Sequence, residues 1–154
     1  MGQKTPTLLV IEDAQDQAIL LGHAARRCHP GIVVHVAPDG YEGCAYLANV
    51  APFDDPHRYA RPTLILLDLY MPELDGFGVL KWIRGRPELA DVPVVVLTSS
   101  SLPEDETRAR WLGARAVYRK PAALDELGAL VREIVEEFVP RRLMLDSMFA
   151  SMGY

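Results

Sequence analysis

The sequence has few cysteines, and neither they nor its histidines form a recognisable cluster. Cys28 and Cys44 lie far apart and make no CxxC pair, so neither a disulfide framework nor a cysteine-rich zinc site is expected. Both lie in helical-looking segments, where packing explains them better. The histidines also lack the spacing of metal ligands, and we expect surface or half-buried positions for all four: His23, His29, His35 and His57.

The sequence also lacks the features of a membrane protein or a nucleic-acid-binding protein. No apolar run approaches the roughly 18 residues that a membrane span requires, and the first ten residues do not resemble a signal peptide. The net charge of -5 and pI of about 5.3 argue against a nucleic-acid-binding surface. With 154 residues, we expect one domain, located in the cytoplasm, with neither a membrane nor a nucleic acid as partner.

Five short apolar runs alternate with helical patterns. The runs are rich in Val, Ile and Leu and mostly continuous, which is typical of strands covered on both faces: 7–11, 32–37, 63–67, 92–98 and 116–119. Asp16 is the expected cap of the first helix, and an apolar stripe from Leu124 to Phe138 predicts the last one. This alternation predicts an α/β fold with a parallel sheet and right-handed crossovers. Residues 51–62 read as a polar loop.

Four of the five predicted strands end on a polar side chain. In the stretch LILLDLYMPELDG, Asp68 follows the third run directly, and the simplest alternative is that it only caps a turn. The other three ends are listed in chain order: Glu12-Asp13 after the first run, Thr98 at the end of the fourth, and Lys120 after the fifth. Because the carboxyl ends of parallel strands face one crevice, we expect these groups to share a site.

The residue types at these ends fit one chemistry. Carboxylates placed close together repel, and a hard divalent cation such as Mg²⁺ relieves that repulsion. Lys120 adds a positive charge for phosphate oxygens, and the Thr98 hydroxyl can donate a hydrogen bond. A carboxylate can attack a phosphoryl group to form an aspartyl phosphate. Each residue alone is a weak signal, but together they favour phosphoryl chemistry at Asp68.

At these residues the chain resembles the response-regulator receiver domain of two-component signalling. The resemblance rests on five stretches that span about residues 7–139: LLVIEDAQDQ, LILLDLYMPELDGFGVLKWIR, VPVVVLTSS, GARAVYRKP and LDELGALVREI. It implies a flavodoxin-like, doubly wound, five-stranded parallel sheet of order 2-1-3-4-5 with helices on both faces. That strand order comes from the resemblance alone.

The resemblance also implies a role for each residue of the acidic site. Asp68 would be the phosphoacceptor, and Mg²⁺ would be bound by Asp13, Asp68 and the backbone carbonyl of Tyr70, with Glu12 acting mostly through water. Lys120 would pair with the phosphoryl group.

Three further residues match positions that respond to phosphorylation or shape the loop after the last strand. Thr98 would contact the phosphoryl group and shift, and Tyr118 would change rotamer with it. Pro121 matches a position usually preceded by a cis peptide bond.

Two positions depart from the commonest pattern of the resembled family. Glu12 stands where Asp is frequent, a tolerated variation, and Tyr70 is bulkier than the usual residue two positions after the acceptor. We hypothesise that Tyr70 hinders the attacking water and lengthens the lifetime of the phosphorylated state.

Three features resemble one subgroup, the stand-alone regulators that accompany bacterial phytochromes and related sensor kinases: the loop 51–62, the acidic Glu12-Asp13 form and the tail past Val139. We therefore expect a receiver domain over residues 1–140, no output domain, and a tail over 141–154 that extends the last helix into a homodimer interface. Its apolar residues would form a patch on a monomer: Met144, Leu145, Met148 and Phe149. The alternative is a tail that folds back on its own domain or is disordered.

The expected function is that of a stand-alone response regulator. A sensor histidine kinase would transfer a phosphoryl group to Asp68 in a Mg²⁺-dependent reaction. The subgroup resemblance points to a bacterial phytochrome as that kinase. The protein would not be an enzyme, apart from slow self-dephosphorylation. One alternative is a pseudo-receiver that docks without being phosphorylated. The other is an aspartyl-phosphate phosphohydrolase, which Tyr70 disfavours because such enzymes usually carry a second Asp there.

Overall fold

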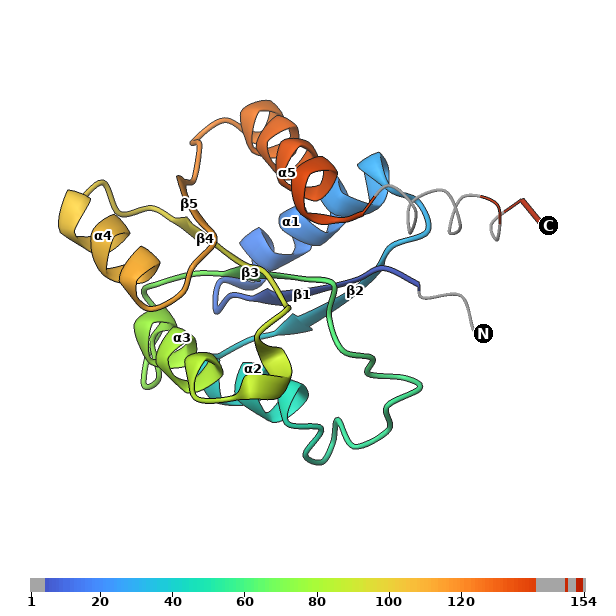
Figure 1. Ribbon diagram of the computed structural model, residues 1–154. Helices are drawn as coiled ribbons and strands as arrows, with labels where there is room; N and C mark the ends of the chain where they lie inside the picture. The colour runs from blue at the N-terminus through green and yellow to red at the C-terminus, as the bar shows by residue number, and fades with distance from the viewer. Residues whose placement is uncertain (1–4, 141–148, 150–151, 154) are drawn as a thin grey trace.

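Five parallel strands form one sheet, and helices cover both of its faces (Figure 1). The computed structural model describes residues 5–140, 149 and 152–153. The strand order is β2-β1-β3-β4-β5, which confirms the predicted flavodoxin-like topology. The strands are β1 (Thr7–Ile11), β2 (Val33–Ala37), β3 (Leu64–Leu67), β4 (Val94–Thr98) and β5 (Ala116–Arg119).

The helices alternate with the strands as the sequence predicts. They are α1 (Gln15–Cys28), α2 (Gly40–Leu47), α3 (Gly76–Arg84), α4 (Pro103–Trp111) and α5 (Leu124–Phe138), with a short 3-10 helix η1 (Pro87–Leu89) before β4. In Figure 1, α1 and α5 lie on one face of the sheet, and α2, α3 and α4 lie on the other. None of the helices within the described ranges is long and apolar enough to cross a lipid bilayer.

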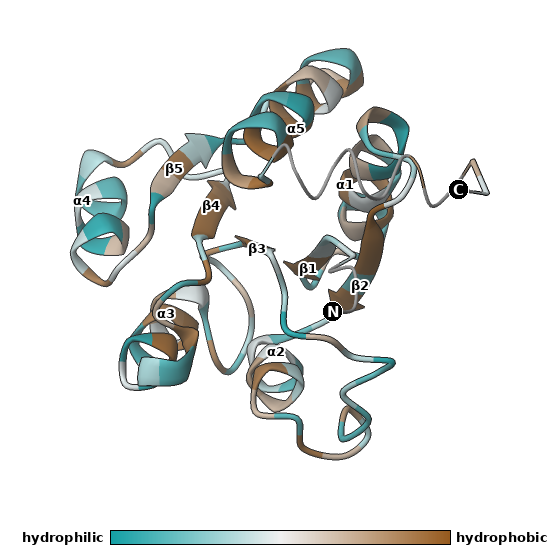
Figure 2. Ribbon diagram, turned by 45° about the vertical axis from the view of Figure 1, so that its right-hand side comes forward, coloured by the Kyte–Doolittle hydropathy of each residue, from teal (hydrophilic) through white to brown (hydrophobic). Residues whose placement is uncertain are grey.

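Alternate residues of each inner strand supply the two halves of the core. From β1, Leu8 and Val10 pack with α1 and α5, whereas Leu9 and Ile11 pack with α2 and α3. The side chains of β1, β3 and β4 are buried on both faces, so these strands read as continuous apolar runs. Figure 2 shows the result as brown strands between helices that carry teal outer surfaces. Strand β2 lies at one edge of the sheet and leaves Val33 and Val36 exposed. The prediction that both faces of every strand are covered is therefore wrong for β2.

The helix ends follow local rules, with one correction. Asp39 and Asp75 cap α2 and α3 by accepting hydrogen bonds from the backbone N–H groups of Glu42 and Gly78. The prediction that Asp16 caps the first helix is wrong. Ala14 occupies the cap position, and Asp16 lies in the first turn, where its charge favours the helix dipole instead.

The loop after α2 is held by aromatic side chains rather than being only polar. Phe53 and Tyr59 pack against Tyr46, with ring centroids 5.5 and 5.8 Å from it. His35 of β2 joins the same cluster at 5.4 Å from Tyr46, and the Tyr46 hydroxyl donates a 2.7 Å hydrogen bond to the carbonyl of Ala60. We predicted the loop but not its anchoring, because two aromatic residues among prolines and charges form no periodic pattern.

Two further expectations concern the backbone and the tail. The predicted cis peptide before Pro121 is wrong: within the described residues the cis bond is Ala51–Pro52. The trans form before a proline is favoured by only about 0.5–1 kcal/mol, so local packing decides which isomer is present.

Met144, Leu145 and Met148 of the predicted apolar patch lie outside the described residues, and Phe149 is partly exposed.

One histidine is more buried than its sequence context suggests. We expected all four at the surface or half-buried, but His29, just after α1, is only 4% exposed. Neither ring nitrogen has a hydrogen-bond partner in the described part of the chain, and burial lowers the pKa of this imidazole. The sequence does not indicate this burial, because His29 follows the last residue of α1 and belongs to no periodic apolar pattern. Its backbone N–H donates to the Ala25 carbonyl at the end of the helix.

We therefore predict that His29 makes the fold sensitive to acid. The folded state disfavours protonated His29, so its cost is absent above the ordinary pKa of about 6.5 and grows as the pH falls below that value. Urea unfolding of wild type and His29→Leu should show a smaller loss of unfolding free energy from pH 8 to pH 5 in the variant. Equal losses would show that His29 does not titrate in this range.

Candidate functional site

The backbone brings three of the predicted site residues to the same edge of the sheet. Each of them continues the hydrogen-bond ladder one residue beyond its strand. The N–H of Glu12 donates to Ala37 at the end of β2, and that of Asp68 donates to Ile11 at the end of β1, both at 3.1 Å. The N–H of Lys120 donates to Thr98 at 2.8 Å. The positions of these side chains are therefore set by the strand register.

The acidic residues form a compact cluster. Single carboxylate oxygens of Glu12, Asp13 and Asp68 lie within 4.8 Å of one another. Glu12 is 2% exposed, the Asp68 side chain is 12% exposed, and Asp13 is exposed. A cluster that runs from buried to open is accessible from one side. The structure thus brings together the three acids that the sequence predicts.

Lys120 supplies the positive charge within this cluster. Its ammonium group donates to the carboxylate of Glu12 and, at 2.6 Å, to the side-chain oxygen of Gln17 in α1. It lies 3.7 Å from Oδ2 of Asp68. Sequence analysis missed Gln17, because an amide in the first turn of a surface helix carries no distinctive signal. Its contact fixes the lysine from the α1 side.

The raised pKa of Glu12 indicates that one lysine does not neutralise the negative charge of the site. Burial, and then the neighbouring Asp68, raise the pKa of Glu12 to about 7 despite the contact with Lys120. Its Oε2 atom is buried and has no hydrogen-bond partner within the described chain. A buried oxygen without a partner, beside two further carboxylates, matches the oxygen ligands that Mg²⁺ prefers. The residues present therefore fit a magnesium ion.

Thr98 and Tyr118 are placed near the ends of neighbouring strands. Thr98 is 2% exposed, and its hydroxyl accepts a 3.1 Å hydrogen bond from the N–H of Ser100. Tyr118 is half-buried on β5, and its hydroxyl donates to Glu137 of α5 at 3.5 Å. The register pairs Thr98 with Arg119, which puts Thr98 next to Lys120. Their predicted roles in switching stay predictions.

Tyr70 does not extend freely into solvent. Although it is 52% exposed, its hydroxyl donates to the carboxylate of Asp105 in α4, and its ring meets that of Phe77 edge-on at 6.3 Å. Ser100 donates to the same Asp105 oxygen at 2.6 Å. Sequence analysis noted Tyr70 but not its partner, because Asp105 reads as one of several acids at a helix start.

Gly76 allows α3 to begin directly against the backbone of Asp68 and Leu69. A side-chain carbon there would lie 2.2 Å from the carbonyl oxygen of Asp68 and 2.7 Å from Cα of Leu69. The Gly76 N–H instead donates to the Leu69 carbonyl at 2.8 Å. Glycine is thus required at this position by close backbone packing.

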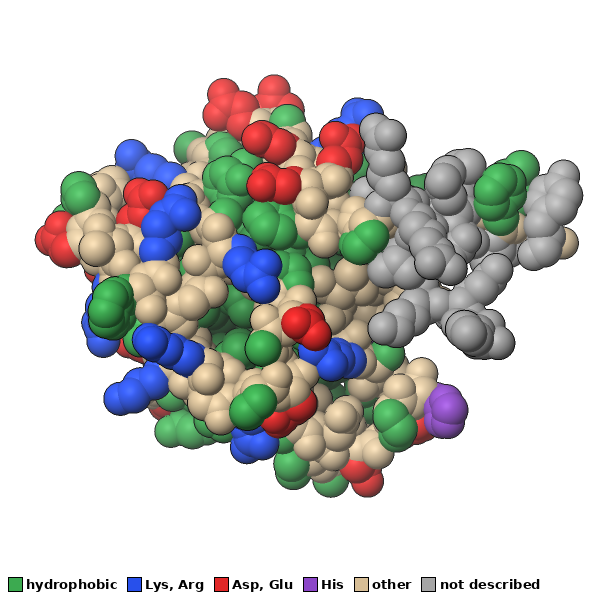
Figure 3. Space-filling view, in the orientation of Figure 1, with side chains coloured by type: hydrophobic (Ala, Val, Ile, Leu, Met, Phe, Trp, Pro, Cys, Tyr) green, Lys and Arg blue, Asp and Glu red, His purple; other side chains and the backbone are tan. Residues whose placement is uncertain are grey.

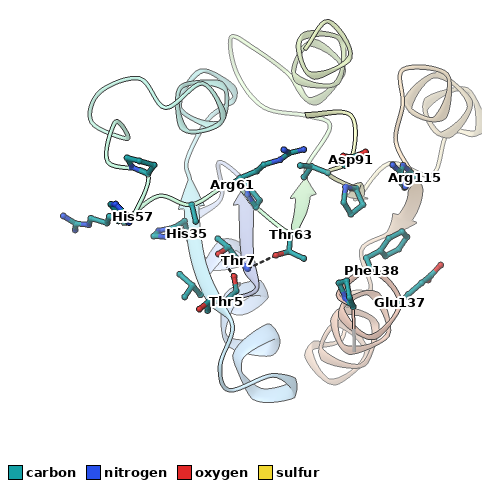
Figure 4. Close-up of a pocket in the computed structure, with 18 residues that line it drawn as sticks. Thr5, Thr7, His35, His57, Arg61, Thr63, Asp91, Arg115, Glu137 and Phe138 are labelled. Atoms are coloured by element: carbon teal, nitrogen blue, oxygen red, sulfur yellow. Dashed lines mark hydrogen bonds between the residues drawn. The ribbon is translucent and has the colours of Figure 1, made fainter. Parts of the chain in front are cut away.

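A separate cavity lies at the opposite end of the sheet. It measures about 890 Å³ and opens where the strands begin, with Thr7, Thr63 and Arg115 around it (Figure 4). None of the predicted site residues lines it. The cavity and the acidic cluster are therefore distinct sites on the molecule.

Comparison with known proteins agrees with this geometry. The response regulator receiver domain model matches residues 8–132. The polar-differentiation response regulator DivK of Brucella anthropi is 39% identical over 70 residues, which cover 46% of this chain and 57% of that protein.

Two solved structures are similar over most of both chains. The phosphorylated cyanobacterial phytochrome response regulator RcpA has a TM-score of 0.82 at 30% identity, over 90% of this chain and 96% of that chain. The Mn²⁺-bound response regulator Rcp1 has a TM-score of 0.75 at 29% identity, over 84% and 91%.

The chain belongs to the response regulator receiver domain family, whose members are signalling domains of two-component systems. The expected fold and family are thus confirmed, and so is the similarity to phytochrome-associated regulators. Mg²⁺ is the cofactor of the acidic pocket in this family, and the Glu12, Asp13 and Asp68 cluster provides that pocket here. Bound there, the ion supplies positive charge for phosphoryl oxygens.

We predict that Gly76→Ala disturbs the site through the backbone. The added carbon would press on the Asp68 carbonyl, so we expect a loss of about 2 kcal/mol in unfolding free energy together with weaker Mg²⁺ binding. Gly78→Ala is the matched control in the same helix turn, because the one close approach of its added carbon is to the flexible end of the Leu74 side chain, and it meets no backbone atom. Urea unfolding and Mg²⁺ titration would measure both; equal behaviour of the two variants would contradict the argument.

Proposed function

We propose that this protein is a response regulator that accepts a phosphoryl group on Asp68 from a phosphohistidine of a sensor histidine kinase. The observation that carries the proposal is the position of Lys120. Its ammonium group lies between the buried Glu12 and the more open Asp68, 3.7 Å from an Asp68 oxygen. That arrangement leaves one carboxylate accessible and places a positive charge beside it.

The transfer follows from these positions. An Asp68 oxygen attacks the phosphorus, the nitrogen–phosphorus bond breaks, and the imidazole nitrogen leaves with the electron pair. Asp68 then carries an acyl phosphate. Lys120 offsets the negative charge on the phosphoryl oxygens, and Thr98 donates its hydroxyl to one of them. Asp13, Asp68 and the Tyr70 carbonyl would hold Mg²⁺, with Glu12 contributing mostly through water, and the ion would offset negative charge on the phosphoryl oxygens.

The phosphorylated state would be read through a change in shape. A phosphorylated side chain carries roughly -1.5 to -2 charges, and this charge draws Thr98 toward Asp68. The Tyr118 side chain then moves into the space that Thr98 leaves. In doing so, its hydroxyl loses the 3.5 Å hydrogen bond to Glu137. The surface formed by α4, β5 and α5 then changes its preference for partners, as a shift between two populated states.

The partners follow from the family and from the surface. The similarity to RcpA supports a phytochrome-type kinase as the phosphodonor. Acidic side chains gather at the top of Figure 3, where Figure 1 places α5, and this negative charge supports the expectation that nucleic acid is not a partner. The exposed acids of α5 are Asp125, Glu126, Glu133, Glu136 and Glu137. We also propose a receiver domain over residues 1–140, a tail over 141–154 that joins two copies, and a cytoplasmic location.

Two alternatives remain distinguishable by experiment. A pseudo-receiver would keep the fold but never become phosphorylated, and the complete set of Glu12, Asp13, Asp68, Thr98 and Lys120 argues against it. A phosphohydrolase needs an acid beside the nucleophile to protonate the leaving group. The hydroxyl of Tyr70, at that position, is instead directed to Asp105. Turnover of small phosphate esters would support the phosphohydrolase.

We predict that acetyl phosphate labels the wild-type protein only in the presence of Mg²⁺. Asp68→Asn keeps the shape of the side chain but removes the nucleophilic oxygen, so it should not be labelled. Intact mass would measure labelling, and light scattering before and after would report self-association. Labelling of Asp68→Asn to the wild-type level would refute Asp68 as the acceptor, and no labelling of wild type would favour the pseudo-receiver.

We also predict that Tyr70 slows the loss of the phosphoryl group. Its bulk beside the acceptor would hinder the attacking water, so Tyr70→Asn should lose the acyl phosphate about tenfold faster, equal to about 1.4 kcal/mol in barrier height. The decay of labelled protein after removal of the phosphodonor measures this rate. Equal decay rates in the two proteins would remove this role for Tyr70.

A further inference from the structure

Three polar side chains join the acceptor segment to the start of α4. The carboxylate of Asp105 accepts hydrogen bonds from the hydroxyls of Tyr70 and Ser100, the latter at 2.6 Å. Tyr70 lies two residues after Asp68, and Ser100 lies two residues after Thr98. One carboxylate therefore ties together the two segments that carry the acceptor and the predicted switch residue.

The contact continues from Ser100 to Thr98. The N–H of Ser100 donates to the Thr98 hydroxyl at 3.1 Å, while its own hydroxyl donates to Asp105 and accepts from the N–H of Leu102 at 3.2 Å. Movement of the Thr98 side chain toward Asp68 pulls on Ser100, and Ser100 is held by Asp105. The observed bonds oppose that movement.

Asp105 is suited to this role by burial and charge. The residue is only 9% exposed, although it lies in the first turn of a surface helix. The hydrogen bonds from Ser100 and Tyr70 lower the pKa of its carboxyl, so it is ionised at neutral pH. Hydrogen bonds to an ionised acceptor are about twice as strong as those between neutral groups.

We propose that Asp105 is a positioning residue that holds this receiver in its unphosphorylated arrangement by binding Tyr70 and Ser100 together. The proposal rests on the proposed function and adds a regulatory contact to it. Phosphorylation then has to break the Ser100–Asp105 bond before Thr98 can engage the phosphoryl group. Removing Asp105 would shift the population toward the activated arrangement and strengthen binding of any phosphoryl mimic at Asp68.

A simpler role for Asp105 is to favour the α4 dipole, as any acid in a first helix turn does. Glu104 lies in the same turn and is exposed. It therefore offers a matched control, because Glu104→Ala removes the same charge near the helix start without touching Tyr70 or Ser100. A dipole role would lower stability in both variants and leave binding at Asp68 unchanged.

The experiment measures binding of beryllofluoride, a mimic of the phosphoryl group, in the presence of Mg²⁺. Calorimetry or fluorine NMR would give the dissociation constant for wild type and each variant. We expect binding about tenfold tighter in Asp105→Ala and about threefold tighter in Tyr70→Phe, which loses only the hydroxyl. Asp105→Asn keeps a neutral acceptor and should fall between wild type and Asp105→Ala.

The outcomes separate this inference from the function on which it rests. Failure of wild type to bind beryllofluoride would count against the proposed function itself. Binding by wild type, with changes smaller than twofold in Asp105→Ala and Tyr70→Phe, would overturn only the role of Asp105. A gain in Glu104→Ala equal to that in Asp105→Ala would do the same. If Asp105→Ala did not fold, the partly exposed Tyr70→Phe would decide.

Discussion

The rest of the site depends on the ion pair that the largely buried Lys120 makes with Glu12. Lys120 follows the last strand, β5, whereas Glu12 follows the first strand, and Asp68, which follows the third strand, lies nearby. Without Lys120, the largely buried carboxylates of Glu12 and Asp68 would repel each other, and one of them would more readily take up a proton. One charge therefore links strands that are far apart in the sequence and partly offsets the repulsion between Glu12 and Asp68.

The sheet makes this contact possible because its hydrogen-bond ladder continues beyond the strands. Glu12, Asp68 and Lys120 each donate a backbone N–H to the end of a neighbouring strand, so their side chains start at the same level. A shift of register by one residue would turn each of them to the other face. On the proposed mechanism, the backbone ladder holds Glu12, Asp68 and Lys120 in place while the Thr98 side chain moves.

The sequence predicted the parts that repeat or that end a strand. The five apolar runs match the strands within two residues, and the charged residues after three of them lie together as expected: Glu12, Asp13, Asp68 and Lys120. Contacts between single side chains from different loops were not predictable, because nothing in the spacing of Gln17 or Asp105 indicates a partner. Two wrong predictions have the same origin: the half-buried position of His29 and the cis peptide bond before Pro121. Tertiary packing, and not the local sequence pattern, decides both features.

The aromatic anchoring of the loop after α2 separates two regions of the molecule. Tyr46, Phe53 and Tyr59 fasten this loop by their rings, and it rejoins the sheet where β3 begins, at the far end from Asp68. Changes in the length or composition of that loop are therefore insulated from the reactive end of the strands. On the proposed function, this layout would let the loop vary between related proteins while the residues around Asp68 stay in place.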